Sequence, residues 1–283
     1  MTTLYHRQLN HIFNRPTTEP AWYWSEHWEE GIFEDEDPLS AFVFIEALLQ
    51  NPALDLAPYS DDQVALGLEF VFNSSVSNLA NDFKVAPVPI ARKMAALRTL
   101  IGLFRDVFNP RCVAKASAGS KQTLSKLNNF CYMFWDECPL SSWINISNFE
   151  EINQSFLAGL SESDLKQMQL PEEVMEMMRQ QVAQAKTVKV KTPEEITADI
   201  QQQYQNLDAE TRGYYEAIAA VMQQCLELDN PACVESGLHG LGHLATFLPD
   251  ITVPIIDGYL KHARNQDKAL LRYAREARTG MIL

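Results

Sequence analysis

The sequence predicts an all-α protein. In most segments apolar residues recur every three or four positions, which is the spacing of one face of an α-helix. Prolines and residues that commonly cap helices separate these segments. No segment keeps the two-residue alternation of a half-buried strand. We therefore expect helices throughout and no sheet.

The first half of the chain contains the clearest helical patterns. Ser60 is a plausible N-cap, and Asn109-Pro110 is a plausible helix end. An aromatic cluster before Cys138-Pro139 is typical of a buried core. The expected helices are Leu39 to Gln50, Asp61 to Asn73, Ile90 to Phe108 and Leu124 to Trp135.

The composition changes after about residue 145, where Glu, Gln and Met become frequent. Thr192 and Pro193 then form a strong helix start. We therefore expect an N-terminal helical region 1–145, a Met- and Gln-rich helical connection 146–192 and a C-terminal helical region 193–283. The methionines of the connection form an adaptable apolar face, which fits either an internal core or a partner-binding helix.

The C-terminal region contains two helical patterns, Thr211 to Leu228 and Ala232 to Phe247, joined by a turn. Residues 214–248 resemble the HEAT and armadillo type of helical repeat. The residues that carry the resemblance are Asp229, Pro231, Val234, Glu235, Ser236, Gly237, Leu241 and Gly242. It implies an irregular α-solenoid, an array of antiparallel helix pairs, that acts as a protein-binding scaffold. Further helices are expected at Val253 to His262 and Gln266 to Arg278.

Three side chains of the second C-terminal helix share one face. Glu235, His239 and His243 follow one another at intervals of four residues. A carboxylate and two imidazoles at this spacing could bind zinc or another divalent metal. Alternatively, His239 and His243 contact a partner, or they are purely structural.

Glycine is unusually frequent in the same helix. Gly237, Gly240 and Gly242 each cost about 1 kcal/mol relative to alanine inside a helix. Close approach of another helix is the usual compensation. We therefore expect a tightly packed face there, or a surface that a ligand approaches.

The charge distribution argues against general affinity for nucleic acids. The formal net charge is −14, whereas phosphate binding depends on clustered Lys and Arg. Two segments differ from the rest of the chain in their charge. One is an acidic stretch at 26–37, and the other is a basic stretch at 84–126. They either pair inside the fold or form partner-binding surfaces, in which Arg98 and Arg105 are candidates.

A second candidate surface lies near the N-terminus. Trp22, Trp24 and Trp28 are close together and are followed by acids. Tryptophan gives a large contact area at a low entropic cost, so these residues could recognise a partner. They could equally anchor the N-terminal segment on the first helices.

Cysteine use and hydropathy predict a cytoplasmic protein. The five cysteines are irregularly spaced, which does not suggest a disulfide framework or a CxxC zinc site. The first 14 residues lack the apolar region of a secretory signal. No apolar run approaches the roughly 20 residues that span a bilayer, so we expect no membrane association.

We therefore expect a protein-binding scaffold, or an accessory or immunity-type interaction protein, that has no catalytic activity and no cofactor. Its expected partner is another protein. No Ser/His/Asp or Cys/His nucleophile arrangement is recognisable. The alternative is a metal-dependent enzyme that uses zinc or another divalent ion at Glu235, His239 and His243.

Overall fold

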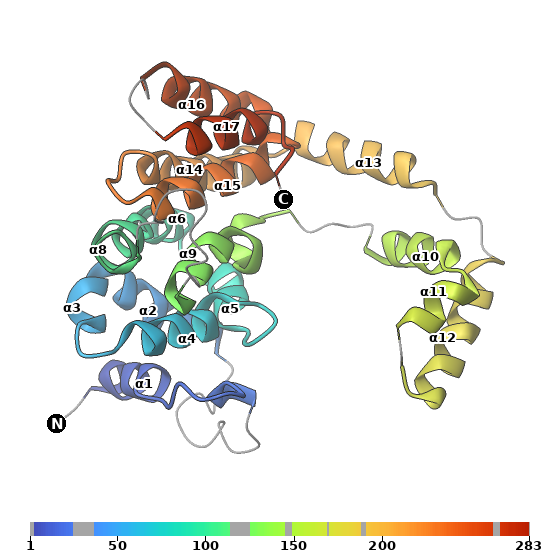
Figure 1. Cartoon of the computed structure of the whole chain (residues 1–283), viewed down its shortest axis with the longest axis horizontal. Coiled ribbons are helices and arrows are strands. Elements are labelled where there is room, and N and C mark those ends of the chain that lie inside the picture. Colours follow the sequence, from blue (N-terminus) through green and yellow to red (C-terminus); the bar gives the residue numbers. More distant parts are fainter. Residues whose placement is uncertain are drawn as a thin grey trace. The chain divides into compact units, whose positions relative to one another are not determined.

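The computed structural model describes residues 3–24, 37–113, 125–144, 149–168, 170–187, 191–262 and 267–282 (Figure 1). Every regular element in these ranges is helical, and none is a strand. The all-α prediction is confirmed. None of the described helices is long and apolar enough to cross a lipid bilayer.

The chain divides into two compact units. Unit 1 combines Met1–Trp143 with Asp208–Leu283, and unit 2 is Ile144–Leu207. The sequence predicted three consecutive regions. In the structure, most of the first region and most of the last region belong to the same unit, unit 1. The predicted boundary at residues 192 and 193 also falls inside unit 2. The helix that begins there packs against the first helix of the same unit, a contact that a local capping signal does not reveal.

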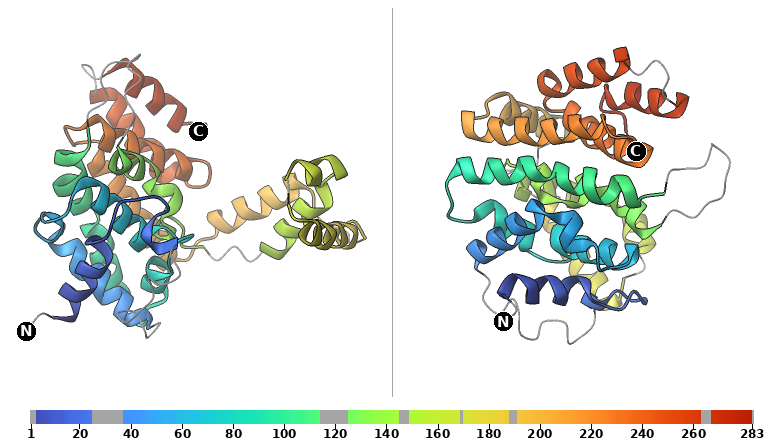
Figure 2. Two further views of the ribbon diagram at one scale, coloured as in Figure 1. Left: turned by 60° about the horizontal axis from the view of Figure 1, so that its bottom comes forward. Right: turned by 90° about the vertical axis from the view of Figure 1, so that its left-hand side faces the viewer.

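The first part of unit 1 is a stack of short helices (Figure 2). Ser60 caps α4, as predicted, and it forms a capping box with Gln63. Large aromatic side chains fill the core, among them a stacked pair of Phe42 and Phe83. The elements are α1 (Leu4–Phe13), η1 (Trp22–Trp24), α2 (Pro38–Gln50), α3 (Pro52–Leu56), α4 (Asp61–Phe72), α5 (Leu79–Val85), α6 (Ile90–Thr99), α7 (Ile101–Leu103), η2 (Phe104–Phe108), α8 (Asn109–Arg111), α9 (Lys126–Glu137) and η3 (Pro139–Ser141).

The predicted helix from Ile90 to Phe108 is divided in the structure. After α6 and α7 the chain forms a π-helical turn, η2, before α8 begins. The backbone N–H of Asn109 donates to the carbonyl of Phe104, five residues earlier. The apolar periodicity predicted the helix, but it does not reveal this wider turn.

Four helices of the C-terminal part of the chain complete unit 1. They are α14 (Ala209–Cys225), α15 (Pro231–Ala245), α16 (Pro249–His262) and α17 (Lys268–Ala277). Helix α15 packs against α9 as well as against α14, α16 and α17, so it lies at the centre of this part of the unit. Figure 1 shows the α14 and α15 layer between α16 and α17 on one side and α6 and α9 on the other.

The glycines of α15 are explained by close packing on three sides. A Cβ atom at Gly237 would meet the Met222 carbonyl of α14 at 2.8 Å. One at Gly240 would lie 2.7 Å from the Trp135 ring of α9, and one at Gly242 would meet Ile282. The expected close approach is therefore present. These contacts also fill the space that a ligand would have needed beside the glycines.

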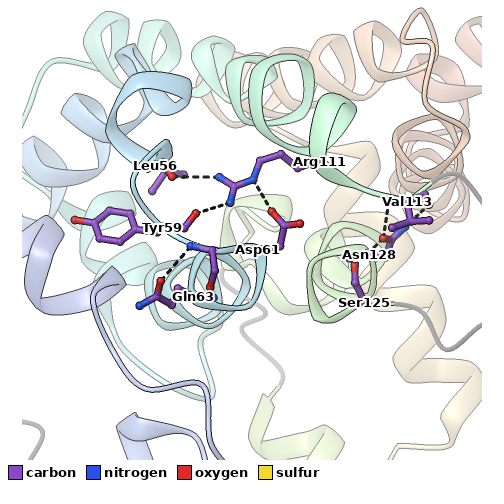
Figure 3. Close-up of polar contacts among 9 residues, drawn as sticks. Leu56, Tyr59, Asp61, Gln63, Arg111, Val113, Ser125 and Asn128 are labelled. Carbon is purple, nitrogen blue, oxygen red and sulfur yellow. Dashed lines mark hydrogen bonds and ion pairs between the residues drawn. The ribbon is translucent and has the colours of Figure 1, made fainter.

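Much of the basic stretch is used inside unit 1. The Arg111 guanidinium bonds to the Asp61 carboxylate at 2.7 Å and to the carbonyls of Leu56 and Tyr59 (Figure 3). It thereby fastens the corner between α3 and α4 to the end of α8. Other pairs within unit 1 are Arg92 with Glu46, Arg105 with Asp106 and Lys126 with Glu19. None of these four acids belongs to the predicted acidic stretch, whose residues 26–36 lie outside the described ranges.

Unit 2 is a small helical module. Its helices are α10 (Phe149–Gly159), α11 (Glu162–Gln167), α12 (Glu172–Ala185) and α13 (Pro193–Gln205). Leu157, Leu165, Met175 and Val182 belong to its core. At least one methionine of segment 146–192, Met175, therefore packs in an internal core. An internal core was one of the two predicted roles for these methionines. Thr192 caps α13, as predicted, and it forms a capping box with Glu195.

Candidate metal centre

Three side chains from two helices converge on one point of unit 1. His239 Nε2 lies 2.7 Å from Asp136 Oδ2, and His243 Nε2 contacts Asp136 Oδ1. The two imidazole Nε2 atoms are 3.0 Å apart. All three ligand atoms lie within 4.8 Å of one another. Ligand bonds to zinc are about 2.0–2.2 Å long, so one ion could reach all three after small adjustments.

Helix geometry brings the two histidines together. They are separated by four residues of α15, so their side chains project from the same face. The carboxylate comes from the last turn of α9, which packs along α15. The Ser236 hydroxyl of α15 donates to the Cys131 carbonyl of α9 at 2.5 Å. This buried hydrogen bond holds the two helices together near the cluster.

The start of α15 is also fixed. Asn230 caps the helix by accepting from the Ala232 N–H, and its amide nitrogen donates to the carbonyls of Asn109 and Cys112. An asparagine cap at a helix start typically contributes about 1 kcal/mol. Here the same side chain ties α15 to the end of α8, so both histidines have a defined position along the helix.

A tyrosine orients the inner histidine. The Tyr273 hydroxyl of α17 lies 2.5 Å from His239 Nδ1 and 3.2 Å from the hydroxyl of Tyr132. The Tyr132 ring also packs against the His239 ring, with centroids 4.4 Å apart. In metal sites the second ring nitrogen of a histidine is commonly held by such an outer partner. His239 Nε2 is therefore fixed in the direction of Asp136 and His243.

The cluster lies at the edge of the core. His239 is only 2% exposed, whereas the side chain of His243 is 46% exposed. Burial is the largest cause that lowers the pKa of His243, and it outweighs the opposing effect of Asp136. The pKa of Tyr273 is raised, mainly by burial and then by its hydrogen bond to Tyr132. Near neutral pH these shifts favour a neutral imidazole at His243 and an uncharged phenol at Tyr273.

This combination of groups suits a divalent transition metal. A metal ligand must be deprotonated, and a neutral imidazole and a carboxylate meet that condition. Two histidines with one carboxylate form a recurrent catalytic zinc set, and they also form the non-haem iron set. Three protein ligands leave at least one coordination position for water or another molecule. The exposed edge of His243 gives access from solvent.

The predicted set of Glu235, His239 and His243 is only partly brought together. Both histidines belong to the cluster, but among the described residues Asp136 supplies its carboxylate. Glu235 lies one turn before His239 on α15 and contributes to the raised pKa of Tyr273. Sequence spacing could not identify Asp136, because it lies 103 residues from His239. Asp136 carries no signal of its own within the aromatic segment around it.

The other predicted contact residues have different environments. Trp22 is buried against the Phe70 ring, and the Arg15 guanidinium lies 4.8 Å from the Trp22 ring centroid. It therefore anchors the N-terminal segment and does not form a free surface. Trp24 is 62% exposed, and Trp28 lies outside the described residues.

The predicted arginines are on the surface. Arg98 and Arg105 are both exposed, and Arg105 forms an ion pair with the adjacent Asp106. His239 is too deeply buried to contact a partner directly. Of the two histidines, only His243 presents an accessible edge.

Comparisons with protein-family models, curated proteins and solved structures found no significant match to this chain.

Proposed function

We propose that this protein binds one divalent transition-metal ion through Asp136, His239 and His243. The observation that supports the proposal is the convergence of a carboxylate and two imidazole nitrogens, with the inner imidazole held from behind by Tyr273. Such outer hydrogen bonds fix the tautomer and orientation of a metal-binding histidine.

The proposed chemistry is that of a Lewis acid. A metal with an open position can lower the pKa of bound water or polarise a carbonyl or phosphoryl oxygen. The protein's own groups would hold the ion, keep His239 oriented and leave one side open beside His243. This is the metal-dependent alternative expected from the sequence, with Asp136 in place of Glu235. Zinc is the first ion to test, and iron the second.

Metal content of protein purified without a histidine tag tests the proposal. We expect about one equivalent of zinc, cobalt or iron to remain after dialysis, as measured by elemental analysis. Asp136→Asn and the double variant His239→Ala with His243→Ala should lose it. His262→Ala is the matched control, because His262 is an exposed helical histidine that bonds to the Gly258 carbonyl. Stoichiometric metal in the double variant, or none in the wild type, would contradict the proposal.

A protein-binding role is our second proposal, and the exposed Trp24 and Arg98 favour it. In this role the chain is an accessory or immunity-type scaffold that recognises another protein. All five cysteines are free and buried, which fits the reducing cytoplasm. Affinity capture from native lysate should recover a partner that is lost on Trp24→Ala or on charge reversal at Arg98 and Arg105. Equal recovery with these variants would count against the role.

A further inference from the structure

Unit 1 contains a cavity that none of the three proposed metal ligands lines. It has a volume of about 490 Å³ and lies between η1, α4 and α9. Helices α4 and α9 pack side by side (Figure 1). The cavity's charged and aromatic lining residues include Glu19, Tyr23, Trp24, Glu69, Lys126 and Glu137.

The charge of the cavity's described lining is unbalanced. Its described lining carries three carboxylates and one ammonium group, and the ammonium of Lys126 pairs with Glu19 at 2.6 Å. The other two acids, Glu69 and Glu137, form no ion pair among the described residues. Their side chains accept hydrogen bonds from neutral donors, the Tyr23 hydroxyl at 2.6 Å and the Asn73 amide at 3.2 Å.

The three cavity acids all act on one phenol. The pKa of Tyr23 is raised by burial, by its hydrogen bond to Glu69 and by the charges of all three cavity acids. A cation between Glu69 and Glu137 would offset their negative charge and could donate to both.

The aromatic wall of the cavity suits the same kind of ligand. Trp24 is one of the residues that line the cavity, and it is 62% exposed. The neighbouring Trp22 already holds the guanidinium of Arg15 over its ring. Trp24 could hold an external cation in the same way, by a cation–π contact.

We propose that this cavity binds an organic cation that carries N–H donors, a guanidinium or primary ammonium group, between Glu69, Glu137 and the Trp24 ring. Charged N–H donors match the two carboxylate acceptors. A quaternary ammonium ion has no N–H group to donate to these carboxylates, so it would keep only their general attraction and the contact with the ring. The cation belongs either to a free small molecule or to a basic side chain of another protein. This site goes beyond the proposed metal centre and does not depend on it.

Calorimetric titration of the full chain with agmatine, which carries both groups, tests the proposal. A blocked Gly-Arg-Gly peptide distinguishes the two sources, because tighter binding of either probe identifies the one that fits. We expect Glu69→Gln and Glu137→Gln each to weaken binding about 10- to 100-fold, as for a lost charge-assisted hydrogen bond. Trp24→Ala should weaken it about 2- to 5-fold. Choline, which has no N–H donor, should bind at least about 10-fold more weakly than agmatine.

Matched variants separate this site from general charge effects and from the metal centre. Glu216→Gln removes one exposed acid of α14 that pairs with Arg212, and it should leave agmatine binding unchanged. His239→Ala should lose metal but keep agmatine binding. Circular dichroism checks that each variant is folded. The proposal is overturned if neither probe binds, if Glu216→Gln weakens binding as much as Glu137→Gln, or if choline binds as tightly as agmatine.

Discussion

At the scale of single residues, Tyr273 determines which nitrogen of His239 faces the cluster. Its hydroxyl is 2.5 Å from Nδ1, so Nε2 points towards Asp136. We predict that Tyr273→Phe weakens metal binding about 10- to 100-fold, which is the usual effect of losing an outer-shell partner. Competition with a chelating dye measures the affinity. Tyr259→Phe is the control, because the Tyr259 hydroxyl is buried with no hydrogen-bond partner in the described residues. Equal affinities for the wild type and Tyr273→Phe would show that Tyr273 does not orient the ligand.

Glu137 gives a pH-dependent prediction. Its pKa in the folded protein is raised above the ordinary value of 4.5, mainly by burial. In the unfolded chain the pKa of Glu137 returns to its ordinary value. Between that value and the raised pKa of the folded protein, the folded state binds more protons than the unfolded chain, so the free energy of unfolding falls as pH rises. The loss then persists at higher pH. Glu137→Gln removes the charge and should therefore stabilise the protein at pH 7.

The expected gain is below about 1 kcal/mol, because a partly solvated carboxylate is well screened. It should shrink as pH falls towards 4.5. Urea unfolding between pH 4 and pH 8 measures this dependence, with Glu216→Gln as the exposed control. A constant difference between Glu137→Gln and the wild type at every pH would exclude the ionisation of Glu137 as the cause. The same substitution should weaken agmatine binding, so stability and ligand binding would change in opposite directions.

The sequence predicted part of the candidate site. Spacing along one helix identified His239 and His243 as neighbours, because the helical repeat fixes that relation locally. It also favoured Glu235 as the acid, for the same reason. The structure places Asp136 there instead, through the packing of α9 on α15. Tyr273 comes from a third helix. Contacts between distant segments depend on tertiary packing, which periodicity within one segment does not contain.

At the scale of elements, α15 depends on glycines that let its neighbours approach. We predict that Gly237→Ala destabilises the protein by about 1–3 kcal/mol, because the new methyl group would overlap the Met222 carbonyl and the Cys225 side chain. This cost exceeds the roughly 1 kcal/mol that alanine gains in helix propensity. Chemical unfolding monitored by circular dichroism measures the change.

Gly258→Ala is the matched control for this prediction. Gly258 is also helical, but a Cβ atom there would meet nothing within 4 Å. The same substitution should therefore stabilise the protein by up to about 1 kcal/mol. If both variants gained stability, close packing would not be the reason for glycine at position 237.

Helix positions were predicted better than their packing. Capping residues such as Ser60 and Thr192 act within one turn, so the sequence shows them directly. The π-helical turn η2 was not predicted, because the same apolar spacing fits either helical register. The strong helix start at Thr192 and Pro193 predicted that α13 begins the C-terminal region. In the structure α13 packs against α10 of unit 2. The HEAT-like array stays a prediction, carried by the resemblance of residues 214–248.

At the scale of the whole molecule, unit 2 is inserted between two segments of unit 1. The exit from unit 1 is well anchored. Trp143 stacks on Tyr214 with ring centroids 3.9 Å apart, and its backbone N–H donates to the hydroxyl of Tyr215. Asp208, where the chain re-enters unit 1, caps the same helix α14. It precedes Tyr215 by about two turns, or roughly 10 Å.

This proximity predicts that unit 2 can be removed. Replacing residues 146–206 by a Gly/Ser linker of about eight residues should span the gap without strain. Unit 1 should then keep its cooperative thermal transition and its metal affinity, because every ligand and Tyr273 lie within it. Calorimetry and metal titration of the shortened chain measure both properties.

A linker variant that also carries Trp143→Ala should be less stable, since it loses the stacked anchor on α14. If the shortened chain were unfolded while the full chain bound metal, the fold of unit 1 would depend on unit 2, and the metal centre would require the intact chain.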